Sequence, residues 1–226
     1  MTMTTLDEKV EAARTVIDSV LRENSGPAAV TCSFQAECMA LVDLVAAKQP
    51  NIPVLFLETG YHFPETYAYR DEMTAKLRLN LVNLSSKMTV PEQEAKFGIL
   101  YQTAPDRCCG MRKVEPLFAG LAPYNIWLTA LRREQSPTRA NLQAVDHFKL
   151  PTGKQLLKVS PLADWTNKDV WGYLKQRGIP VLPLYDQGYT SIGCAPCTSL
   201  PLDPENARSG RWAGKKLECG IHIQSE

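Results

Sequence analysis

The sequence predicts an α/β fold with a largely parallel sheet and an irregular C-terminal part. Short apolar segments rich in β-branched or aromatic residues alternate with segments that carry apolar residues at helical spacing. Such alternation is typical of parallel sheets, because each parallel strand is reached through a helical crossover. Beyond about residue 180, frequent prolines and glycines interrupt both patterns and indicate loops.

Each element follows from its local pattern. The expected strands are Ala28–Cys32, Pro53–Leu57, Leu79–Leu84, Asn125–Leu128 and Leu156–Val159. The expected helices are Leu6–Leu21, Ala36–Lys48, Glu65–Leu77, Pro91–Phe97 and Lys168–Gln176. We expect Pro64 to open the third helix and Asn167 to cap the last. With no repeat and no boundary in the first 165 residues, we expect one domain over residues 1–226, with an N-terminal helix within 1–27 and a mobile tail over about 200–226.

Composition limits the classes of partner. Of 226 residues, 44% are hydrophobic and 22% charged, enough to bury a substantial core. Lysine and arginine total 25 against 24 acidic residues, so a net charge of +1 gives no general case for nucleic acid or an anionic membrane. The N-terminal segment mixes acids with helical apolar spacing, which excludes a secretory signal, and no apolar run approaches the roughly 18 residues of a membrane span. We therefore expect a cytoplasmic protein.

Five of the seven cysteines form a pattern that indicates chemistry. Cys108 and Cys109 are adjacent, Cys194 and Cys197 form a CxxC, and Cys219 lies near the C-terminus. Four thiolates at one site suit zinc or an iron–sulfur cluster. On a helix, neighbouring side chains diverge by about 100°, which favours a cluster over one small tetrahedral ion. A strained disulfide, unrelated buried thiols and structural zinc stay open as alternatives.

The total of seven cysteines also indicates how they are used. A reducing cytosol favours metal or redox chemistry over structural disulfides. Four ligands and one reactive thiol leave Cys32 and Cys38, which we interpret as packing residues.

Two strand ends are candidates for nucleotide binding, because ligands settle at the carboxyl ends of parallel strands. The first strand runs into residues 31–37, where Ser33 and backbone N–H groups are available to an anion, and the second runs into 57–60. Neither is a Walker or GxGxxG turn, so ordinary connections remain an alternative. Residues 129–139 contain three arginines and the tail adds Arg208 and Arg211; arginine forks suit phosphate and sulfate, although such runs are often solvated.

Several motifs together resemble one family. They are Cys108-Cys109, residues 112–117, residues 131–136, residues 193–198 and residues 218–222. In this order, over about residues 28–222, the chain resembles the bacterial assimilatory adenylyl-sulfate reductases. The resemblance implies an adenine-nucleotide α-hydrolase-like fold, a 4Fe–4S cluster, and thioredoxin-dependent reduction of adenosine 5′-phosphosulfate to sulfite and AMP. Because relatives that use the 3′-phosphorylated substrate usually lack both cysteine pairs, it favours the unphosphorylated substrate.

The resemblance also assigns roles to single residues. The implied cluster ligands are Cys108, Cys109, Cys194 and Cys197, and the implied nucleophile is Cys219. The implied substrate-binding residues are Ser33, Leu57, Thr59, Gly60, Lys113, Arg139, Arg208, Arg211 and His222. The chain departs from the family pattern at Gln35 and Cys38, near positions where a glycine and an acid are common, and at Ala130, which replaces a common glycine.

The implied reaction passes through a sulfonated Cys219, which thioredoxin or glutaredoxin, as a separate protein, resolves to sulfite. A homo-oligomer is compatible with the sequence. The alternatives are a reductase of the 3′-phosphorylated substrate, an ATP-dependent PP-loop enzyme, and an iron–sulfur redox sensor or zinc protein without catalysis.

Overall fold

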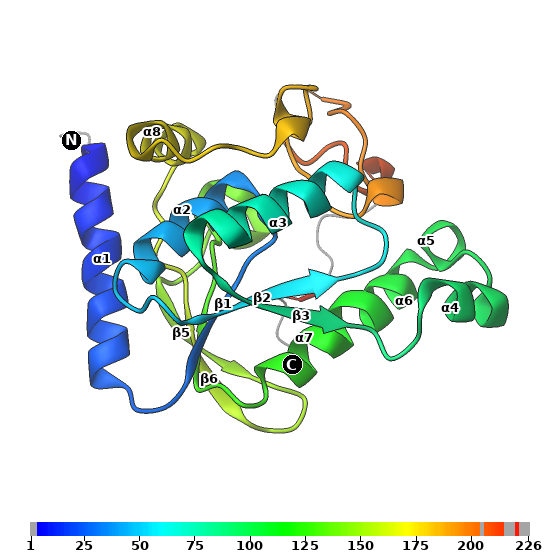
Figure 1. The fold of residues 1–226 in the computed structure, drawn as a ribbon, viewed down its shortest axis with the longest axis horizontal. Helices are drawn as coiled ribbons and strands as arrows, with labels where there is room; N and C mark the ends of the chain where they lie inside the picture. Colours follow the sequence, from blue (N-terminus) through cyan, green and yellow to red (C-terminus); the bar gives the residue numbers. More distant parts are fainter. Residues whose placement is uncertain (1–3, 204–205, 215–219, 222–226) are drawn as a thin grey trace.

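The computed structural model describes residues 4–203, 206–214 and 220–221, and in these residues six strands form one sheet (Figure 1). The order across the sheet is β3-β2-β1-β4-β6-β5. The strands are β1 Ala28–Thr31, β2 Pro53–Glu58, β3 Asn80–Ser85, β4 Ile126–Leu128, β5 Val145–Lys149 and β6 Gln155–Val159. Only β5 pairs antiparallel, with β6, among the described strands. The predicted α/β class with a mostly parallel sheet is confirmed.

Helices lie before β1, after β6 and in the connections from β1 to β4. The α-helices are α1 Leu6–Glu23, α2 Ala36–Ala46, α3 Pro64–Leu77, α4 Val90–Phe97, α5 Leu100–Thr103, α6 Pro105–Cys109, α7 Glu115–Leu121 and α8 Asn167–Arg177. A π-helix, η1, covers Gly110–Val114, and short 3₁₀ turns are η2 Arg133–Gln135, η3 Pro137–Arg139, η4 Pro183–Tyr185, η5 Ala195–Cys197 and η6 Trp212–Gly214. None of the described helices is long and apolar enough to cross a membrane.

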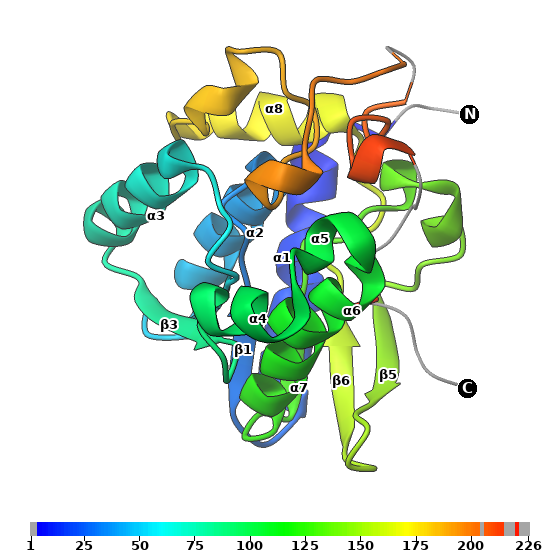
Figure 2. The same cartoon turned by 90° about the vertical axis from the view of Figure 1, so that its right-hand side faces the viewer.

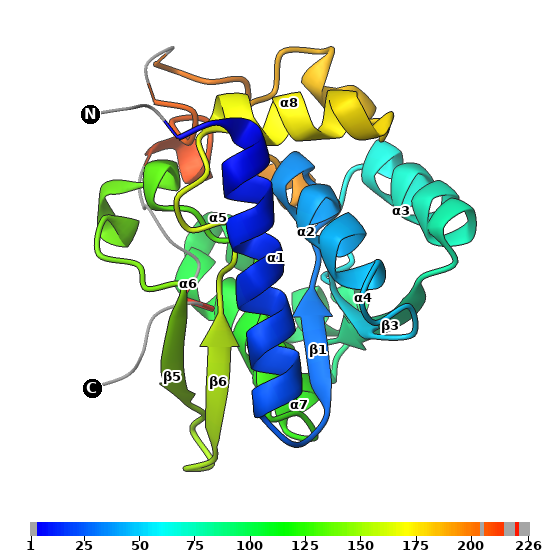
Figure 3. The same cartoon turned by 90° about the vertical axis from the view of Figure 1, so that its left-hand side faces the viewer.

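Both faces of the sheet are covered, and successive side chains along a central strand point to opposite faces. Val30 and Leu128 pack under α1, α2 and α8, whereas Ala29, Leu55 and Trp127 pack against α7 on the other face. Figures 2 and 3 show the two sides, with α7 crossing one face and α1 beside α2 on the other. Burying each large side chain contributes about 1.5–3 kcal/mol, so the two layers hold the sheet edge that carries the loops.

The helix starts test two detailed expectations. Pro64 does open α3, as its first-turn proline. The cap of α8 is Thr166 rather than Asn167, so that prediction was wrong. Thr166 Oγ1 accepts from the Asp169 backbone N–H at 3.2 Å, and the Asp169 carboxylate accepts from the Thr166 N–H at 2.7 Å. This reciprocal capping box satisfies two donors, whereas an Asn167 cap would leave the Thr166–Asp169 pair unused.

The strand order reverses between β1 and β4, since the chain passes from β1 to β2 and β3 on one side and then returns to β4 on the other. Ligand sites in open α/β sheets lie at such a switch point, outside the carboxyl ends of the strands. The turns after β1 and β2 open on this edge, and the described C-terminal residues fold over it: Ala195 donates its N–H to the Tyr61 carbonyl at 2.7 Å. The irregular character predicted for this part is confirmed for the described residues.

Candidate active site

The tandem cysteines lie on a short helix that a proline starts and a π-helix continues. Pro105 occupies the first turn of α6, and Cys108 and Cys109 at its end are 7% and 6% exposed. In η1 the Glu115 N–H bonds to the Gly110 carbonyl, five residues back. Pro116 has no N–H for the carbonyl of Arg112, so the regular α-helical bond cannot form there, and the turn widens. The widened turn carries Arg112 and Lys113 directly after the two cysteines.

The second cysteine pair is fixed to the turn after β2. The Cys194 thiol donates to Thr59 Oγ1 at 3.4 Å, and the following residue bonds to Tyr61 through its backbone. The Cys197 N–H closes a tight turn onto the Cys194 carbonyl at 2.9 Å. Thr59 is fully buried, so the predicted nucleotide turn and the CxxC form one packed unit.

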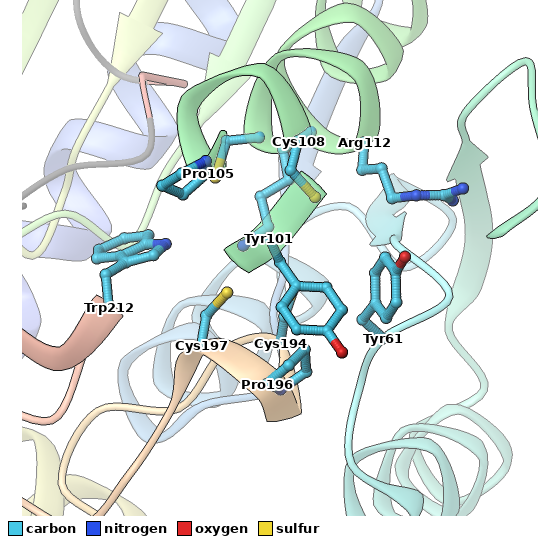
Figure 4. Close-up of a pocket in the computed structure, with 11 residues that line it drawn as sticks. Tyr61, Tyr101, Pro105, Cys108, Arg112, Cys194, Pro196, Cys197 and Trp212 are labelled. Atoms are coloured by element: carbon cyan, nitrogen blue, oxygen red, sulfur yellow. The ribbon is translucent and has the colours of Figure 1, made fainter. Parts of the chain in front are cut away.

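The four cysteines of the two pairs line one small cavity, as the sequence predicted. Its lining consists of Tyr61, Tyr101, Pro105, Cys108, Cys109, Arg112, Lys113, Cys194, Pro196, Cys197 and Trp212. Figure 4 shows the sulfurs of Cys108 and Cys197 facing the space between α6 and the CxxC turn, with Trp212 beside them. Segments separated by more than 80 positions in the sequence therefore meet at one group of thiols.

Arg112 positions the Thr59–Gly60 turn, a role that the sequence did not single out. Its Nη1 donates to the Thr59 carbonyl at 3.0 Å and its Nη2 to the Met88 carbonyl at 3.2 Å, while the guanidinium lies 5.3 Å from the Tyr61 ring centre. A fully buried guanidinium needs such acceptors to offset its desolvation. The signal available was its place in the 112–117 motif.

The tail arginine Arg211 packs against the CxxC turn. It is 5% exposed, and its guanidinium lies 4.6 Å from the Trp212 ring centre. A Cβ atom at Gly193 would lie 2.1 Å from Arg211 Nη2, so a larger residue before Cys194 would displace this guanidinium. Arg208 is half-buried, in the turn that precedes Arg211. Trp212, which sequence reasoning missed, completes the cavity wall.

Cations and burial compete at the thiols. Burial alone would raise the pKa of Cys194, but Lys113, the Thr59 hydroxyl and Arg211 together lower it. Burial, with the nearby cysteines, raises the pKa of Cys108 to about 11, and burial also raises the pKa of Cys197. The positive charges on this cavity are those that an anionic group held by four thiolates requires.

The donor set fits an iron–sulfur cluster. Four thiols line one cavity, the Cys194 thiol bonds to the Thr59 hydroxyl, and the charges of Lys113 and Arg211 act on Cys194. Among the described residues, no three His, Cys, Asp or Glu side chains are grouped as ligands of a single metal ion.

The turn after β1 presents Ser33 at the surface. Phe34, with φ +59°, is completely buried and contacts Phe56 at a ring distance of 5.7 Å, which anchors the turn. Cys32 and Cys38 are buried, as expected of packing residues, and Cys38 Sγ also accepts from the Ser33 N–H at 3.4 Å. The half-buried Leu57 packs toward α7, and Gly60 has φ +74°, which favours glycine.

The three arginines of residues 129–139 differ in their contacts. Arg132 is buried and donates to the Trp165 carbonyl at 3.2 Å, and Arg133 pairs with Asp164. Arg139 donates to Gln135, whose Nε2 in turn donates to Glu37 Oε1 at 2.6 Å. Among these arginines, the structure thus links Arg139, the predicted substrate ligand, to the start of α2 through Gln135. Ala130 is buried, 7% exposed.

Two predicted site residues, Cys219 and His222, lie outside the described residues, so their assigned roles stay predictions. Their described neighbours reach the same region. Ile221 packs on the core cluster beneath α7, and a Cβ atom at Gly220 would contact Val114 of η1 at 3.5 Å. Gly220 and Ile221, the two residues between Cys219 and His222 in the sequence, therefore pack against η1 and α7.

The structure defines an α/β protein with a mostly parallel sheet and a cavity lined by four cysteines. Comparisons with known proteins place it in a family. A model of the phosphoadenosine phosphosulfate reductase domain matches residues 27–200. The chain belongs to this family. The adenosine 5′-phosphosulfate reductase of Geobacillus kaustophilus is 42% identical over 223 residues, which cover 96% of this chain and 92% of that protein.

One further relative is named for a different substrate, and one solved structure shares the fold at low sequence identity. The phosphoadenosine 5′-phosphosulfate reductase of Gloeobacter violaceus is 44% identical, with 84% of this chain and 80% of that protein covered. The crystal structure of phosphoadenylyl-sulfate reductase from Candida auris in a phosphate complex superposes with a TM-score of 0.70 at 22% identity, covering 88% of this chain and 98% of that one. At that identity the structure supports the fold alone.

Proposed function

We propose that the protein reduces adenosine 5′-phosphosulfate to sulfite and AMP in sulfate assimilation. The observation that carries the proposal is the convergence of both cysteine pairs, with Lys113 and Arg211, on the turn after β2. Family membership and the relative in Geobacillus kaustophilus named for this activity support it. We propose the unphosphorylated substrate because, in the family that the sequence resembles, both cysteine pairs usually accompany it, and both pairs line the cavity here.

The chain's own residues divide the reaction into two steps. The Cys219 thiolate attacks the sulfur of the substrate, a Cys219–sulfonate bond forms, and the bond from sulfur to the phosphate oxygen of AMP breaks. A thiol of thioredoxin or glutaredoxin then attacks the Cys219 sulfur, sulfite leaves, and a second thiol of that partner releases Cys219 as a disulfide forms in the partner. The dithiol supplies the two electrons.

The basic residues bind and orient the phosphosulfate. Lys113, on η1, lines the same cavity as the four thiols, and Arg211 packs on the CxxC turn. Arg139, Arg208 and His222 complete the proposed anion contacts, with Ser33, Leu57, Thr59 and Gly60 on the nucleotide. Cys108, Cys109, Cys194 and Cys197 would hold a 4Fe–4S cluster, which would add an anionic centre that shapes the field at the sulfate. We further propose a cytoplasmic location, as the reducing partner requires.

A second candidate is reduction of the 3′-phosphorylated substrate, favoured by the relative in Gloeobacter violaceus that is named for it. Sulfite release distinguishes the two when both nucleotides are offered to the anaerobically purified protein with thioredoxin. We expect kcat/KM for adenosine 5′-phosphosulfate to exceed that for the 3′-phosphorylated form by at least about a hundredfold, a difference of about 2.7 kcal/mol. A preference for the 3′-phosphorylated form would establish the second candidate, and ATP-dependent pyrophosphate release without sulfite would indicate a PP-loop enzyme instead.

A further inference from the structure

The side chain of Gln35 joins the turn after β1 to the segment that leads into the CxxC. Gln35 lies at the N-cap position of α2 but makes no side-chain cap bond. Its Oε1 accepts from the Ile192 backbone N–H at 2.9 Å, and its Nε2 donates to Ser33 Oγ at 3.0 Å. Because the Ile192 N–H is only a donor, this contact fixes which end of the amide faces which partner.

The orientation of the amide decides what Ser33 can do. A serine hydroxyl has one hydrogen to donate and two lone pairs to accept. Gln35 occupies one lone pair of the Ser33 hydroxyl, so the hydroxyl hydrogen remains available for an acceptor. In this structure one such acceptor is Cys38 Sγ, 3.4 Å from Ser33 Oγ. Ser33 is exposed at the carboxyl edge of the sheet, so the same hydrogen can turn to an anionic oxygen of a bound nucleotide.

The other end of the amide fixes the cysteine segment. Ile192 is 4% exposed and lies two residues before Cys194, and the Gly193 N–H donates to Thr198 Oγ1 at 3.1 Å. The turn after β2 is bonded to the same segment through Thr59 and Cys194. Gln35 thus ties the first nucleotide turn to a segment that the second turn already holds.

We propose that Gln35 is a positioning residue, which orients the Ser33 hydroxyl toward the phosphate of the nucleotide and holds the β1–α2 turn in register with the CxxC. This assignment rests on the proposed function for the identity of the nucleotide. No common residue shorter than glutamine spans both contacts, and glutamate keeps the acceptor for Ile192 but loses the hydrogens for Ser33. Glycine at this position would make neither contact.

The test measures AMP binding by calorimetry on the whole protein, because AMP binding reports on the turn even where turnover fails. Gln35→Met keeps the length but removes both hydrogen bonds, and we expect AMP to bind about tenfold more weakly, as loss of one or two hydrogen bonds implies. Gln187→Met is the matched control, since Gln187 is exposed, lies five residues before Ile192 in the sequence, and makes neither of the two Gln35 contacts; this variant should bind AMP as wild type does. The isosteric variant Gln35→Glu should also bind AMP more weakly. It provides the test if Gln35→Met does not fold.

A double-mutant cycle separates positioning from a general loss of structure. If Gln35 acts through Ser33, Gln35→Met should weaken AMP binding by at most about threefold in a Ser33→Ala background, because the group it orients is already gone. A full tenfold effect in that background, or normal AMP binding by Gln35→Met or Gln35→Glu, would overturn the proposal, as would wild type that does not bind AMP. Wild type that binds AMP but releases no sulfite from adenosine 5′-phosphosulfate would remove the proposed function and leave this test intact.

Discussion

Replacing Cys219 with serine is expected to lower sulfite production by at least about a thousandfold, the scale on which loss of a nucleophile acts. A thiol has a pKa of about 8.5 and supplies some thiolate at neutral pH, whereas a serine hydroxyl stays protonated. The serine also gives no S-sulfonate for a dithiol to resolve. Steady-state sulfite release with excess thioredoxin measures the effect.

The controls for this variant are binding and iron content. Cys219→Ser and Cys219→Ala should bind AMP as wild type does and keep the same iron, because the four cavity cysteines and the nucleotide turns are unchanged. The two variants should lose activity equally, since both lack the thiol. Sulfite production within tenfold of wild type by either variant would remove Cys219 from the role of nucleophile.

The second large effect concerns the four cavity cysteines. Anaerobically purified wild type is expected to contain about four iron and four labile sulfide per chain, as four-cysteine clusters do. Cys197→Ala should reduce both to below about one, because a cubane with three thiolate ligands exposes one iron to solvent and oxidation. Iron and acid-labile sulfide are measured directly, without reference to activity.

Cys32→Ala is the control, because Cys32 is a buried cysteine, 3% exposed, that lies in the turn after β1 and does not line the cavity, whereas Cys197 is half-buried. It should keep its iron and sulfide at wild-type levels. Equal loss of iron from Cys32→Ala and Cys197→Ala would indicate a general loss of structure instead of a ligand effect. Stoichiometric zinc without labile sulfide in an active wild-type preparation would contradict the cluster outright.

The elements that the sequence predicted correctly are those with strong local signals. The buried parallel strands have continuous apolar runs, and β1, β2 and β6 end within one residue of the expected positions. Strand β5 was missed because it is an edge strand in which only Phe148 is buried, so its pattern is weak. The short helices α5 and α6 were missed because each has about one turn, too few residues for helical spacing to show.

The site divides in the same way. The convergence of the four cysteines followed from residue type and spacing, and the structure confirms it. The roles of Arg112, Trp212 and Gln35 were not found, because they depend on contacts with distant segments: the Thr59 carbonyl, the cavity shared with Cys108 and Cys109, and the Ile192 N–H. No local pattern predicts such contacts. Cys219 and His222 remain predictions from the resemblance.

Transfer of a sulfonate from adenosine 5′-phosphosulfate to the protein is the central claim, and intact-protein mass spectrometry tests it most directly. Wild type mixed with the nucleotide in the absence of any thiol reductant should gain one SO₃ group per chain, located on Cys219 by peptide mapping, with AMP released in equal amount. Addition of thioredoxin should remove the group as sulfite. An unmodified protein that nevertheless releases AMP and sulfite, or a sulfonate located on another residue, would contradict this account.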